Sequence, residues 1–466
     1  MLVLARLLSP GDFGIITVAL IPIGFAQLFV EIGVGAAIIR TKNLTEEHIS
    51  TGFTVSLLNG VAMALIFLLI NPLIAGFFNI PHLLTALNML VVIFPLQMAA
   101  KISYSLMQRD MNFKKLAGND IISYLAGYAL VGVPLAYFGY GYKSLILATI
   151  VQTLVYSLLL FFSQPHKIVF KINKAIYKEL IAYGSKSSFS NFFDYLAQNG
   201  DYFVVGKTMD VVSLGLYSRA YKLMDMANTM IGSVMTKVLF ANFSKLEIND
   251  QKATPILKKS YEMVFIVFIP VAAISFLLAP EIVRVLLGKQ WTDVTPIFQA
   301  IAVGMIFRMG QKVSSSFTKK SSAIKQMVYV QLFYFICVVA GAYIGTHFNL
   351  VAVALAVNCS ILISFLLLTN LAVKHSEYKW SMLSSDFIHH LAINLPLIIS
   401  VWAWSHFARA FAIPGVAIIL GAFLIWIALC LIIIKVKVKW FFGDNTEWVQ
   451  KKFLYKIPGF RKYNVV

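Results

Sequence analysis

Long apolar segments, separated by short polar stretches, follow one another along the whole chain. A helix needs about 20 apolar residues to cross the roughly 30 Å hydrocarbon core of a bilayer. Thirteen segments meet this length, and we place them at 11–39, 50–79, 83–108, 118–138, 143–163, 184–206, 212–240, 258–287, 293–317, 325–345, 349–372, 387–408 and 413–436. The apolar opening 1–8 has the composition of the end of one more. The pattern predicts an all-α membrane protein, a multi-span helical bundle.

Two stretches of sequence occur twice, at nearly the same separation. AAKISYSLMQR at 99–109 is matched by GQKVSSSFTKK at 310–320, a shift of 211 residues (312 − 101 = 211). ARLLSPGDFGIITVA at 5–19 is matched by GKTMDVVSLGLYSRA at 206–220, a shift of 201 (207 − 6 = 201). Each match is weak alone, because apolar segments resemble one another by composition, but their order and offsets agree. Duplicated membrane lobes are typical of transporters that bind their substrate between the two halves.

The duplication predicts two pseudo-symmetric six-helix lobes. The N-lobe is expected at 1–163 and the C-lobe at 184–372, joined by an amphipathic cytoplasmic linker at 164–183. Two extra C-terminal helices at 387–436 and a basic cytoplasmic tail at 437–466 lie outside the duplication.

The first helix is expected to be truncated. Eight residues of helix rise about 12 Å, well short of the hydrocarbon core. The span that matches it starts near 184, and its counterpart (184 − 201) falls before residue 1. A truncation or a misassigned start codon explains this better than a signal peptide, because no basic segment or small-residue cleavage site precedes SPGDFG.

Composition excludes a soluble protein. The chain has 466 residues, of which 59% are hydrophobic and 13% charged, and its mean hydropathy is +0.80. A soluble chain of this length needs far more charge to cover its surface. Cys337, Cys359 and Cys430 lie within apolar spans, so no disulfide framework is predicted.

The formal net charge of +19 is distributed unevenly between the two sets of loops. Alternate loops carry fifteen Lys and Arg residues, and the other set carries three, Lys207, Lys289 and Arg409. The positive-inside rule places the basic loops and the tail in the cytoplasm. Contact with anionic lipid then accounts for the charge, and no nucleic-acid partner is expected.

One helical face of the seventh span is polar. Its members are spaced by four, three, four and three residues, and they are Ser187, Asn191, Asp194, Gln198 and Asp201. This spacing stacks them on one side of a helix. Charge at the bilayer centre costs about 2.5–3.5 kcal/mol on insertion scales, so the stripe is expected to line a wet cavity. The alternative is helix–helix hydrogen bonding without a ligand.

Several cations lie within other spans. Arg308 and Lys312 are four residues apart, and Arg219, Lys222 and Asp225 are spaced by threes; Lys101 lies in the fourth span. We expect these cations to converge on the same cavity and to bind an anion such as a diphosphate. Internal pairing with Asp225 or Asp194 is the alternative, and for Lys101 and Lys312 so is snorkelling to the membrane surface.

The chain offers few groups for coupling to an ion gradient and none for catalysis. Glu31 could bind a proton or pair with Lys101, or it could be a snorkelled surface acid; Asp194, Asp201 and Asp225 are further ion-coupling candidates. No GxxxxGK[ST], GxSxG or HExxH motif stands at a suitable position, and no His, Cys and Asp spacing suggests a metal. We therefore predict neither a cofactor nor an enzyme.

Four segments of the chain resemble a known family. ARLLSPGDFGII, FVEIGVGAAIIR, LGLYSRAYKLM and LLGKQWTDVTPIF resemble bacterial polysaccharide transporters. These are Wzx-type lipid-linked oligosaccharide flippases of the multidrug/oligosaccharidyl-lipid/polysaccharide exporter superfamily, and the resemblance covers essentially the whole chain.

The resemblance implies a function. It suggests that an undecaprenyl-diphosphate-linked repeat unit is flipped across the bacterial cytoplasmic (inner) membrane by alternating access, for capsule, O-antigen or exopolysaccharide synthesis. Membrane lipid, a coupling proton or sodium ion, and polysaccharide polymerase and export proteins are the implied partners. The alternatives are a flippase or exporter for another amphipathic substrate, such as a peptidoglycan precursor or a drug, and a non-transporting scaffold for glycan synthesis.

Overall fold

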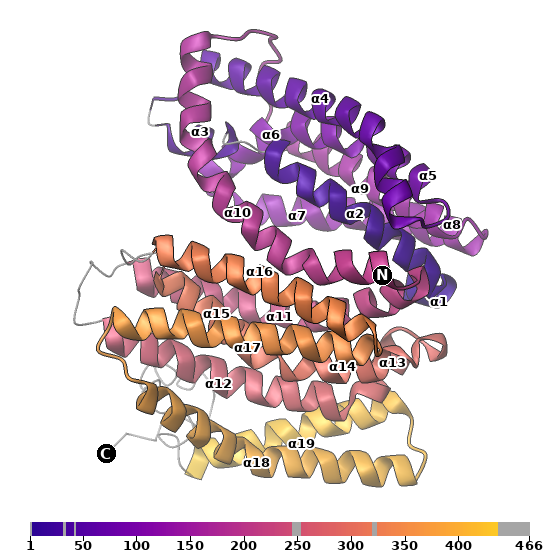
Figure 1. Ribbon diagram of the computed structural model, residues 1–466, viewed down its shortest axis with the longest axis vertical. Helices are drawn as coiled ribbons and strands as arrows, with labels where there is room; N and C mark the ends of the chain where they lie inside the picture. The colour runs from indigo at the N-terminus through magenta and orange to yellow at the C-terminus, as the bar shows by residue number, and fades with distance from the viewer. Residues whose placement is uncertain (1, 31–33, 42, 245–252, 319–323, 437–466) are drawn as a thin grey trace. The chain divides into compact units, whose positions relative to one another are not determined.

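The computed structural model describes residues 2–30, 34–41, 43–244, 253–318 and 324–436 (Figure 1). Every regular element in these ranges is helical, and ten candidate spans among them are long and apolar enough to cross a membrane. The predicted all-α membrane fold is thereby confirmed. The chain forms two compact units, Met1–Ser218 and Arg219–Val466, and each is described by itself. The predicted lobe boundaries stay a prediction.

The first unit contains ten helices with a π-helical turn among them, together with the start of an eleventh, in the part of the chain described. They are α1 (Leu2–Leu7), α2 (Pro10–Val30), α3 (Val34–Arg40), α4 (Glu46–Phe78), α5 (Leu83–Leu90), α6 (Ile93–Arg109), α7 (Phe113–Tyr124), η1 (Leu125–Gly132), α8 (Val133–Tyr137), α9 (Tyr142–Ser163), α10 (Lys174–Thr208) and the start of α11 (Val211–Ser244).

The second unit takes up the rest of α11 and continues to α19. Its elements are α12 (Ala253–Leu277), α13 (Ala279–Leu286), η2 (Lys289–Trp291), α14 (Val294–Val303), α15 (Met305–Thr318), α16 (Ile324–Thr346), α17 (Leu350–Lys374), α18 (Trp380–Ala410) and α19 (Gly415–Val436). Arg409 holds α18 to α13 through an ion pair with Glu281 at 2.8 Å.

Local sequence explains where the helices begin. Before α4, the Thr45 hydroxyl accepts a hydrogen bond from the backbone N–H of His48, and the His48 ring returns the contact, which forms a capping box. Glu46 and Glu47 then place negative charge in the first turn, where the helix dipole favours it. Because these polar residues extend the helix, α4 begins four residues before the apolar span predicted at 50–79.

The two units pack their helices in the same order. In the first unit α4 contacts α6, α6 contacts α9, and α9 contacts α7 and η1. In the second unit the equivalent pairs are α12 with α15, α15 with α17, and α17 with α16, which lies beside α17 in Figure 1. The break between α5 and α6 also recurs between α14 and α15, within two residues of the 211-residue shift.

The repeated serines make equivalent hydrogen bonds. Ser105 Oγ donates to the Lys101 carbonyl at 2.9 Å, and Ser316 Oγ donates to the Lys312 carbonyl at 2.7 Å. The other repeated pair, Ser103 and Ser314, is completely buried. The similarity found at 99–109 and 310–320 therefore extends to the geometry of individual side chains.

The 201-residue shift is visible within the first unit, where α2 crosses the start of α11. A β-carbon on Gly14 would overlap the Val211 carbonyl, and one on Gly215 would overlap the Pro10 carbonyl. The shift relates Gly14 to Gly215 and Pro10 to Val211, so each glycine meets the backbone of the other repeat. The crossing thus has an approximate two-fold symmetry and depends on two positions without side chains.

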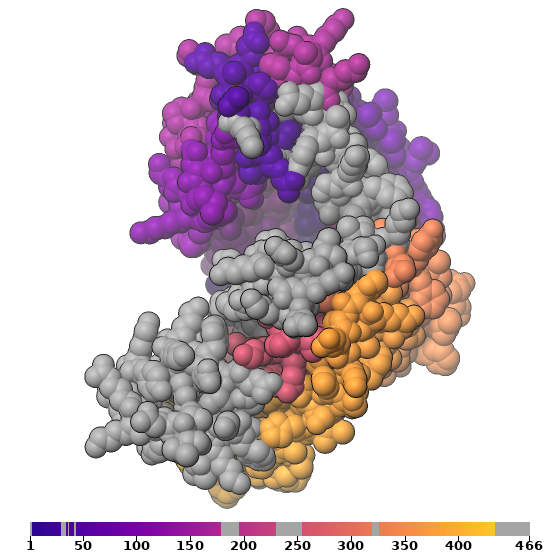
Figure 2. All heavy atoms as spheres, turned by 90° about the vertical axis from the view of Figure 1, so that its left-hand side faces the viewer, coloured from indigo at the N-terminus to yellow at the C-terminus, as the bar shows by residue number. Residues whose placement is uncertain are grey.

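Exposed apolar side chains cover the outside of the helices. On α4 they include Leu58, Leu65, Leu69 and Leu73. In the second unit, α17 to α19 expose apolar side chains too, and these helices form the orange-to-yellow surface in Figure 2. Such a surface is unfavourable in water and is expected for helices that face lipid.

Candidate functional site

Lys101 belongs to α6 in the first unit, and its side chain passes beside Gly35 of α3. Its ammonium is 5.7 Å from the centroid of the Tyr104 ring, and the side chain is half-buried. A β-carbon on Gly35 would come within 2.9 Å of Lys101 Cε and 3.0 Å of Ser105 Oγ. The absence of a side chain at Gly35 therefore leaves the space through which the lysine stem passes.

In the second unit, Arg308 and Lys312 of α15 lie near residues of α11. The Arg308 guanidinium lies 5.3 Å from the centroid of the buried Tyr221 ring and donates a long hydrogen bond of 3.5 Å to its hydroxyl. Lys312, one turn further along α15, is near enough to Arg308 and Asp225 for their charges to act on it. Arg219 is half-buried, whereas Lys222 and Asp225 are exposed. The structure thus brings Arg308 and Lys312 of α15 near Tyr221 and Asp225 of α11.

The polar stripe predicted on the seventh span is only partly described. Gln198 is exposed, but Asp201 is 2% exposed and accepts hydrogen bonds from the Tyr217 hydroxyl at 2.8 Å and from the Tyr202 backbone N–H at 2.9 Å. Asp201 therefore links α10 to α11. The side chains of Asn191 and Asp194, and all of Glu31, lie outside the described residues.

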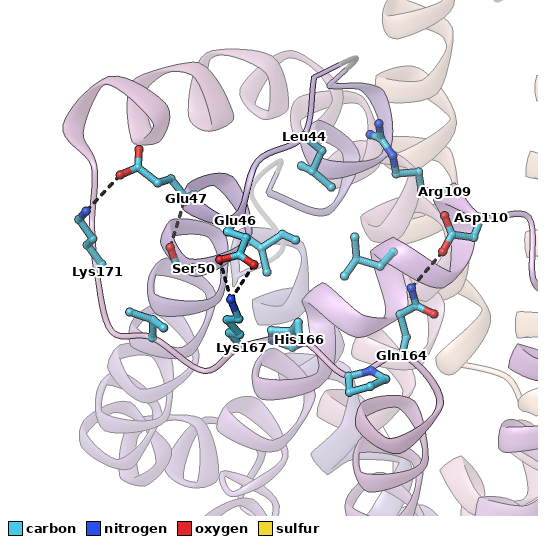
Figure 3. A pocket seen from close by; sticks show the side chains of 14 residues that line it. Leu44, Glu46, Glu47, Ser50, Arg109, Asp110, Gln164, His166, Lys167 and Lys171 are labelled. Carbon is cyan, nitrogen blue, oxygen red and sulfur yellow. Dashed lines mark hydrogen bonds and ion pairs between the residues drawn. The ribbon is translucent and has the colours of Figure 1, made fainter.

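A pocket of about 750 Å³ opens at one end of the first unit (Figure 3). It lies where the start of α4, the end of α6 and the segment after α9 meet. Its lining is Leu44, Glu46, Glu47, Ile49, Ser50, Leu106, Arg109, Asp110, Gln164, Pro165, His166, Lys167, Val169 and Lys171. Three cations and three carboxylates balance in this lining, so the pocket has no formal preference for an anion.

The charged side chains of the pocket hold its own walls together. Lys167 pairs with Glu46 at 2.8 Å, and Lys171 pairs with Glu47 at 3.1 Å. Arg109 donates to the carbonyls of Ile38 and Thr41, at 2.8 and 2.6 Å, and so binds the C-terminal end of α3. These contacts stabilise the site, and they use the groups that an anionic ligand would need.

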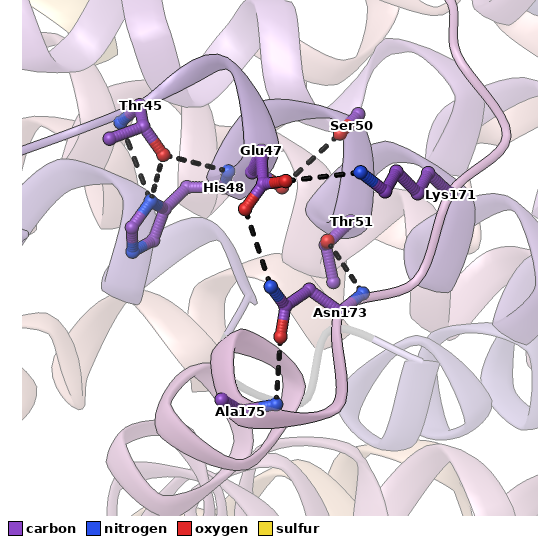
Figure 4. A network of polar contacts seen from close by, with 8 residues as sticks. All are labelled: Thr45, Glu47, His48, Ser50, Thr51, Lys171, Asn173 and Ala175. Carbon is purple, nitrogen blue, oxygen red and sulfur yellow. Dashed lines mark hydrogen bonds and ion pairs between the residues drawn. The ribbon is translucent and has the colours of Figure 1, made fainter.

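One wall of the pocket is an irregular segment, residues 164–173, which we call the strap. It runs from the end of α9 to Asn173, whose side chain caps α10 by accepting from the Ala175 N–H (Figure 4). The backbone N–H of Asn173 donates to Thr51 Oγ1 at 3.2 Å. Ser103 Oγ donates to the Gln164 carbonyl at 3.0 Å. Helices α4 and α6 thus hold both ends of the strap.

His166 of the strap contacts residues of α4, α6 and α9. Its ring packs edge-on between Phe53 and Phe161, with centroid distances of 5.4 and 5.5 Å, and its Nδ1 lies 3.2 Å from Ser103 Oγ. Burial lowers the pKa of His166, although a hydrogen bond with the Gln164 backbone acts in the opposite direction. The neutral ring is therefore the form that fits this site.

Sequence reasoning did not find the role of His166 or of the α4 threonines. A signal existed for Ser103, because the repeat pairs it with Ser314, which contacts Tyr261 and Thr369 through hydroxyl groups at 2.7 and 3.0 Å. A serine repeated at a buried position indicates a hydrogen bond in both copies, but its partner cannot be read from the pattern.

The repeated packing and the candidate spans define a multi-pass membrane protein of duplicated helical architecture. Residues 3–296, more than half of the chain, match the model of a family described as polysaccharide biosynthesis protein. The chain belongs to this family, the Wzx-type polysaccharide transporters of the multidrug/oligosaccharidyl-lipid/polysaccharide exporter superfamily.

Two similar proteins illustrate the family. The succinoglycan biosynthesis transport protein ExoT of Rhizobium meliloti is 27% identical over 305 residues, which cover 65% of this chain and 61% of ExoT. The lipopolysaccharide biosynthesis protein WzxC of Escherichia coli is 23% identical over 324 residues, 69% of this chain and 66% of WzxC. The chain thus matches about three fifths to two thirds of the length of these relatives.

Solved structures show the same fold at lower sequence identity. The lipid II flippase MurJ, in an inward closed conformation, aligns with a TM-score of 0.74 over 94% of this chain and 96% of its own, with 17% identity. An inward-facing multidrug resistance MATE family transporter aligns with a TM-score of 0.62 over 83% of this chain and 94% of its own, with 14% identity.

Proposed function

We propose that this protein flips an undecaprenyl-diphosphate-linked oligosaccharide across the bacterial cytoplasmic membrane by alternating access, for the synthesis of a surface or secreted polysaccharide. The observation that carries the proposal is a cation at the same place in both repeats. Lys101 and Lys312 are related by the 211-residue shift, and each accepts the same serine hydrogen bond on its carbonyl. Family membership supports a polysaccharide substrate.

The chemistry of the cations suits a diphosphate. A diphosphate carries several negative oxygens, which need more than one positive partner. Arg308 offers a planar donor fork, and the Tyr221 ring restrains it from one side. Lys312 and Lys222 add ammonium groups within the same unit, and Arg219 adds a second guanidinium. That these groups and Lys101 bind one substrate stays a prediction, which the variants below test.

The direct test is complementation of a bacterial strain that lacks its own polysaccharide flippase. Lys101→Ala and Lys312→Ala are each expected to lower surface polysaccharide at least tenfold, and the double variant is expected to abolish it. Lipid-linked repeat units should accumulate on the cytoplasmic leaflet, and immunoblots of the membrane should show unchanged protein. A tenfold loss corresponds to about 1.4 kcal/mol of lost interaction, which is modest for one phosphate contact.

The matched control is Lys374→Ala, which removes an exposed lysine at the end of α17. It changes the net charge by the same amount and should leave polysaccharide at the wild-type level. Normal polysaccharide from the Lys101→Ala, Lys312→Ala double variant would refute the phosphate-binding role of the pair.

A further inference from the structure

The second and third turns of α4 are enclosed on every side. All seven residues from 50 to 56 are buried, including both faces of the helix. Further along, the lipid-facing stripe begins at Leu58 and continues through Leu65 and Leu69. A helix at the outside of a bundle normally keeps one face exposed throughout its length. Helices α3, α6 and α10 pack against α4, and the face that carries Thr51 and Thr54, in line with Leu58, is covered as well.

The strap provides this cover. The Lys171 backbone N–H donates to Thr54 Oγ1 at 3.2 Å, and Thr54 Oγ1 lies 3.3 Å from the Val169 carbonyl oxygen. With the bond from Asn173 to Thr51, two backbone N–H groups of the strap donate to hydroxyl groups of α4. Backbone groups that protein satisfies in this way lower the cost of placing an irregular segment at the edge of the hydrocarbon core.

The outer edge of the strap is apolar. Ile168, Phe170 and Ile172 alternate along it, and they are 52%, 71% and 46% exposed. Val169 between them is 45% exposed as well, and the Phe170 ring also contacts the Phe53 ring of α4, with centroids 6.0 Å apart. The strap therefore presents an apolar surface beside α4. Lys167 and Lys171 are paired with Glu46 and Glu47, which leaves the charged part of the strap formally neutral.

The length of α4 gives the depth of the strap. Its 33 residues extend about 50 Å, whereas the hydrocarbon core is about 30 Å thick. If the excess is shared between the two ends, about 10 Å of helix, or seven residues, lies outside the core at each end. Thr51 and Thr54 then lie at the boundary between acyl chains and headgroups, and Glu46 lies among the headgroups.

We propose that the strap is embedded in the bilayer interface, with Ile168, Phe170 and Ile172 inserted at the acyl-chain boundary of the leaflet that loop charges assign to the cytoplasmic side. The occupant of this surface is lipid, because the apolar edge is continuous with the lipid-facing stripe of α4. The Lys–Glu pairs lower the cost of bringing lysines to this depth. The proposal does not depend on the transported substrate.

Site-directed spin labelling tests the depth. The three cysteines are first replaced by serine, and nitroxides are attached to Ile168→Cys, Phe170→Cys and Ile172→Cys in the full chain, reconstituted in vesicles of phosphatidylethanolamine and phosphatidylglycerol. Leu65→Cys is the matched lipid-facing control, and Lys114→Cys, an exposed lysine at the start of α7, is the aqueous control. The strap labels should collide with oxygen more than with a water-soluble nickel chelate, as the Leu65 label does.

Two outcomes would overturn the proposal. Accessibility to the nickel chelate equal to that at Lys114 would place the strap in water, and protection from both reagents would mean that protein covers it. A second variant guards against misfolding by the labels: Phe170 is replaced by photoreactive p-benzoylphenylalanine, which keeps an aromatic ring. Illumination should yield phospholipid adducts detectable by mass spectrometry, whereas cross-links to polypeptide would contradict lipid as the occupant.

Discussion

At the scale of single residues, a glycine leaves the space that a lysine side chain needs. Lys101 occupies the space that a side chain on Gly35 would fill. We therefore expect Gly35→Val to displace the lysine and to lower surface polysaccharide about as much as Lys101→Ala does, at least tenfold. Membrane immunoblots and the complementation assay check this expectation.

Gly118→Val is the matched control for Gly35→Val. It lies on α7, where a β-carbon would meet nothing within 4 Å, and both substitutions change helix propensity equally. If the two variants lose polysaccharide to the same extent, the effect comes from helix propensity and Lys101 is not positioned by Gly35.

His166 predicts a pH dependence of stability. Because burial lowers its pKa, the folded strap binds a proton less readily than the unfolded chain, whose histidine titrates near about 6.5. The stabilising contribution is present above about pH 6.5 and is lost as the pH falls through the lowered pKa. In detergent, the thermal unfolding midpoint should fall by about 2–4 °C more in the wild type than in His166→Phe on acidification.

A wild-type and a His166→Phe protein with parallel pH profiles would contradict this assignment. Phenylalanine is the suitable replacement because it preserves the packing against Phe53 and Phe161. It removes the titration together with the Nδ1 contact to Ser103, so the slopes of the two pH profiles are compared and not their absolute midpoints. Other histidines contribute equally to both profiles, so the difference between the two proteins isolates His166.

At the scale of elements, α2 and α11 approach each other closely where they cross. Gly14→Ala and Gly215→Ala would each push a methyl group into a backbone carbonyl that belongs to another helix. Backbone cannot rotate away as a side chain can, so we expect each variant to be destabilised by about 1–3 kcal/mol. Thermal unfolding in detergent measures the loss.

The control for the crossing is Gly76→Ala on α4, where a β-carbon meets nothing within 4 Å. Alanine is the better helix former by about 1 kcal/mol, so this variant should be neutral or slightly more stable. A Gly215→Ala protein that behaves like Gly76→Ala would show that the two helices do not need their close approach.

Some of the predicted spans are broken into two helices. The apolar pattern predicts one span at 293–317, but the structure contains α14 and α15 with a break at Gly304. There the Asn358 side chain of α17 donates a hydrogen bond to the Ala300 carbonyl. The freed carbonyl is thus satisfied by a residue more than fifty positions away, which no local pattern can reveal.

At the scale of the whole molecule, loop charge predicts the orientation in the membrane. With a membrane-impermeant maleimide on intact cells, Lys289→Cys in the cysteine-free protein should be labelled, whereas Lys114→Cys should be labelled only after the membrane is permeabilised. Both lysines are exposed, so accessibility depends on the side of the membrane. The reverse labelling pattern would contradict the predicted orientation and the cytoplasmic placement of the strap.

Much of the architecture could be predicted because the bilayer imposes a simple rule on sequence. Every described span falls on one to three helical elements, from α2 at 11–39 to α19 at 413–436. The repeat at 99–109 and 310–320 is accompanied by equivalent hydrogen bonds of Ser105 and Ser316. The gathering of Arg308 and Lys312 near Tyr221 and Asp225 agrees with the helical spacing of these residues, since a helix places positions three and four apart on one side.

The sequence alone determined the number and order of most spans, the duplication and the expected side of each loop, because hydropathy, repetition and charge are properties of the chain itself. Which polar groups meet depends on the tertiary packing. Asp201 turns to Tyr217, Thr51 and Thr54 bind the strap, and His166 fits between two phenylalanines. Some of these contacts join residues more than one hundred positions apart. Their geometry depends on how neighbouring helices pack, and a local pattern in the sequence does not encode this.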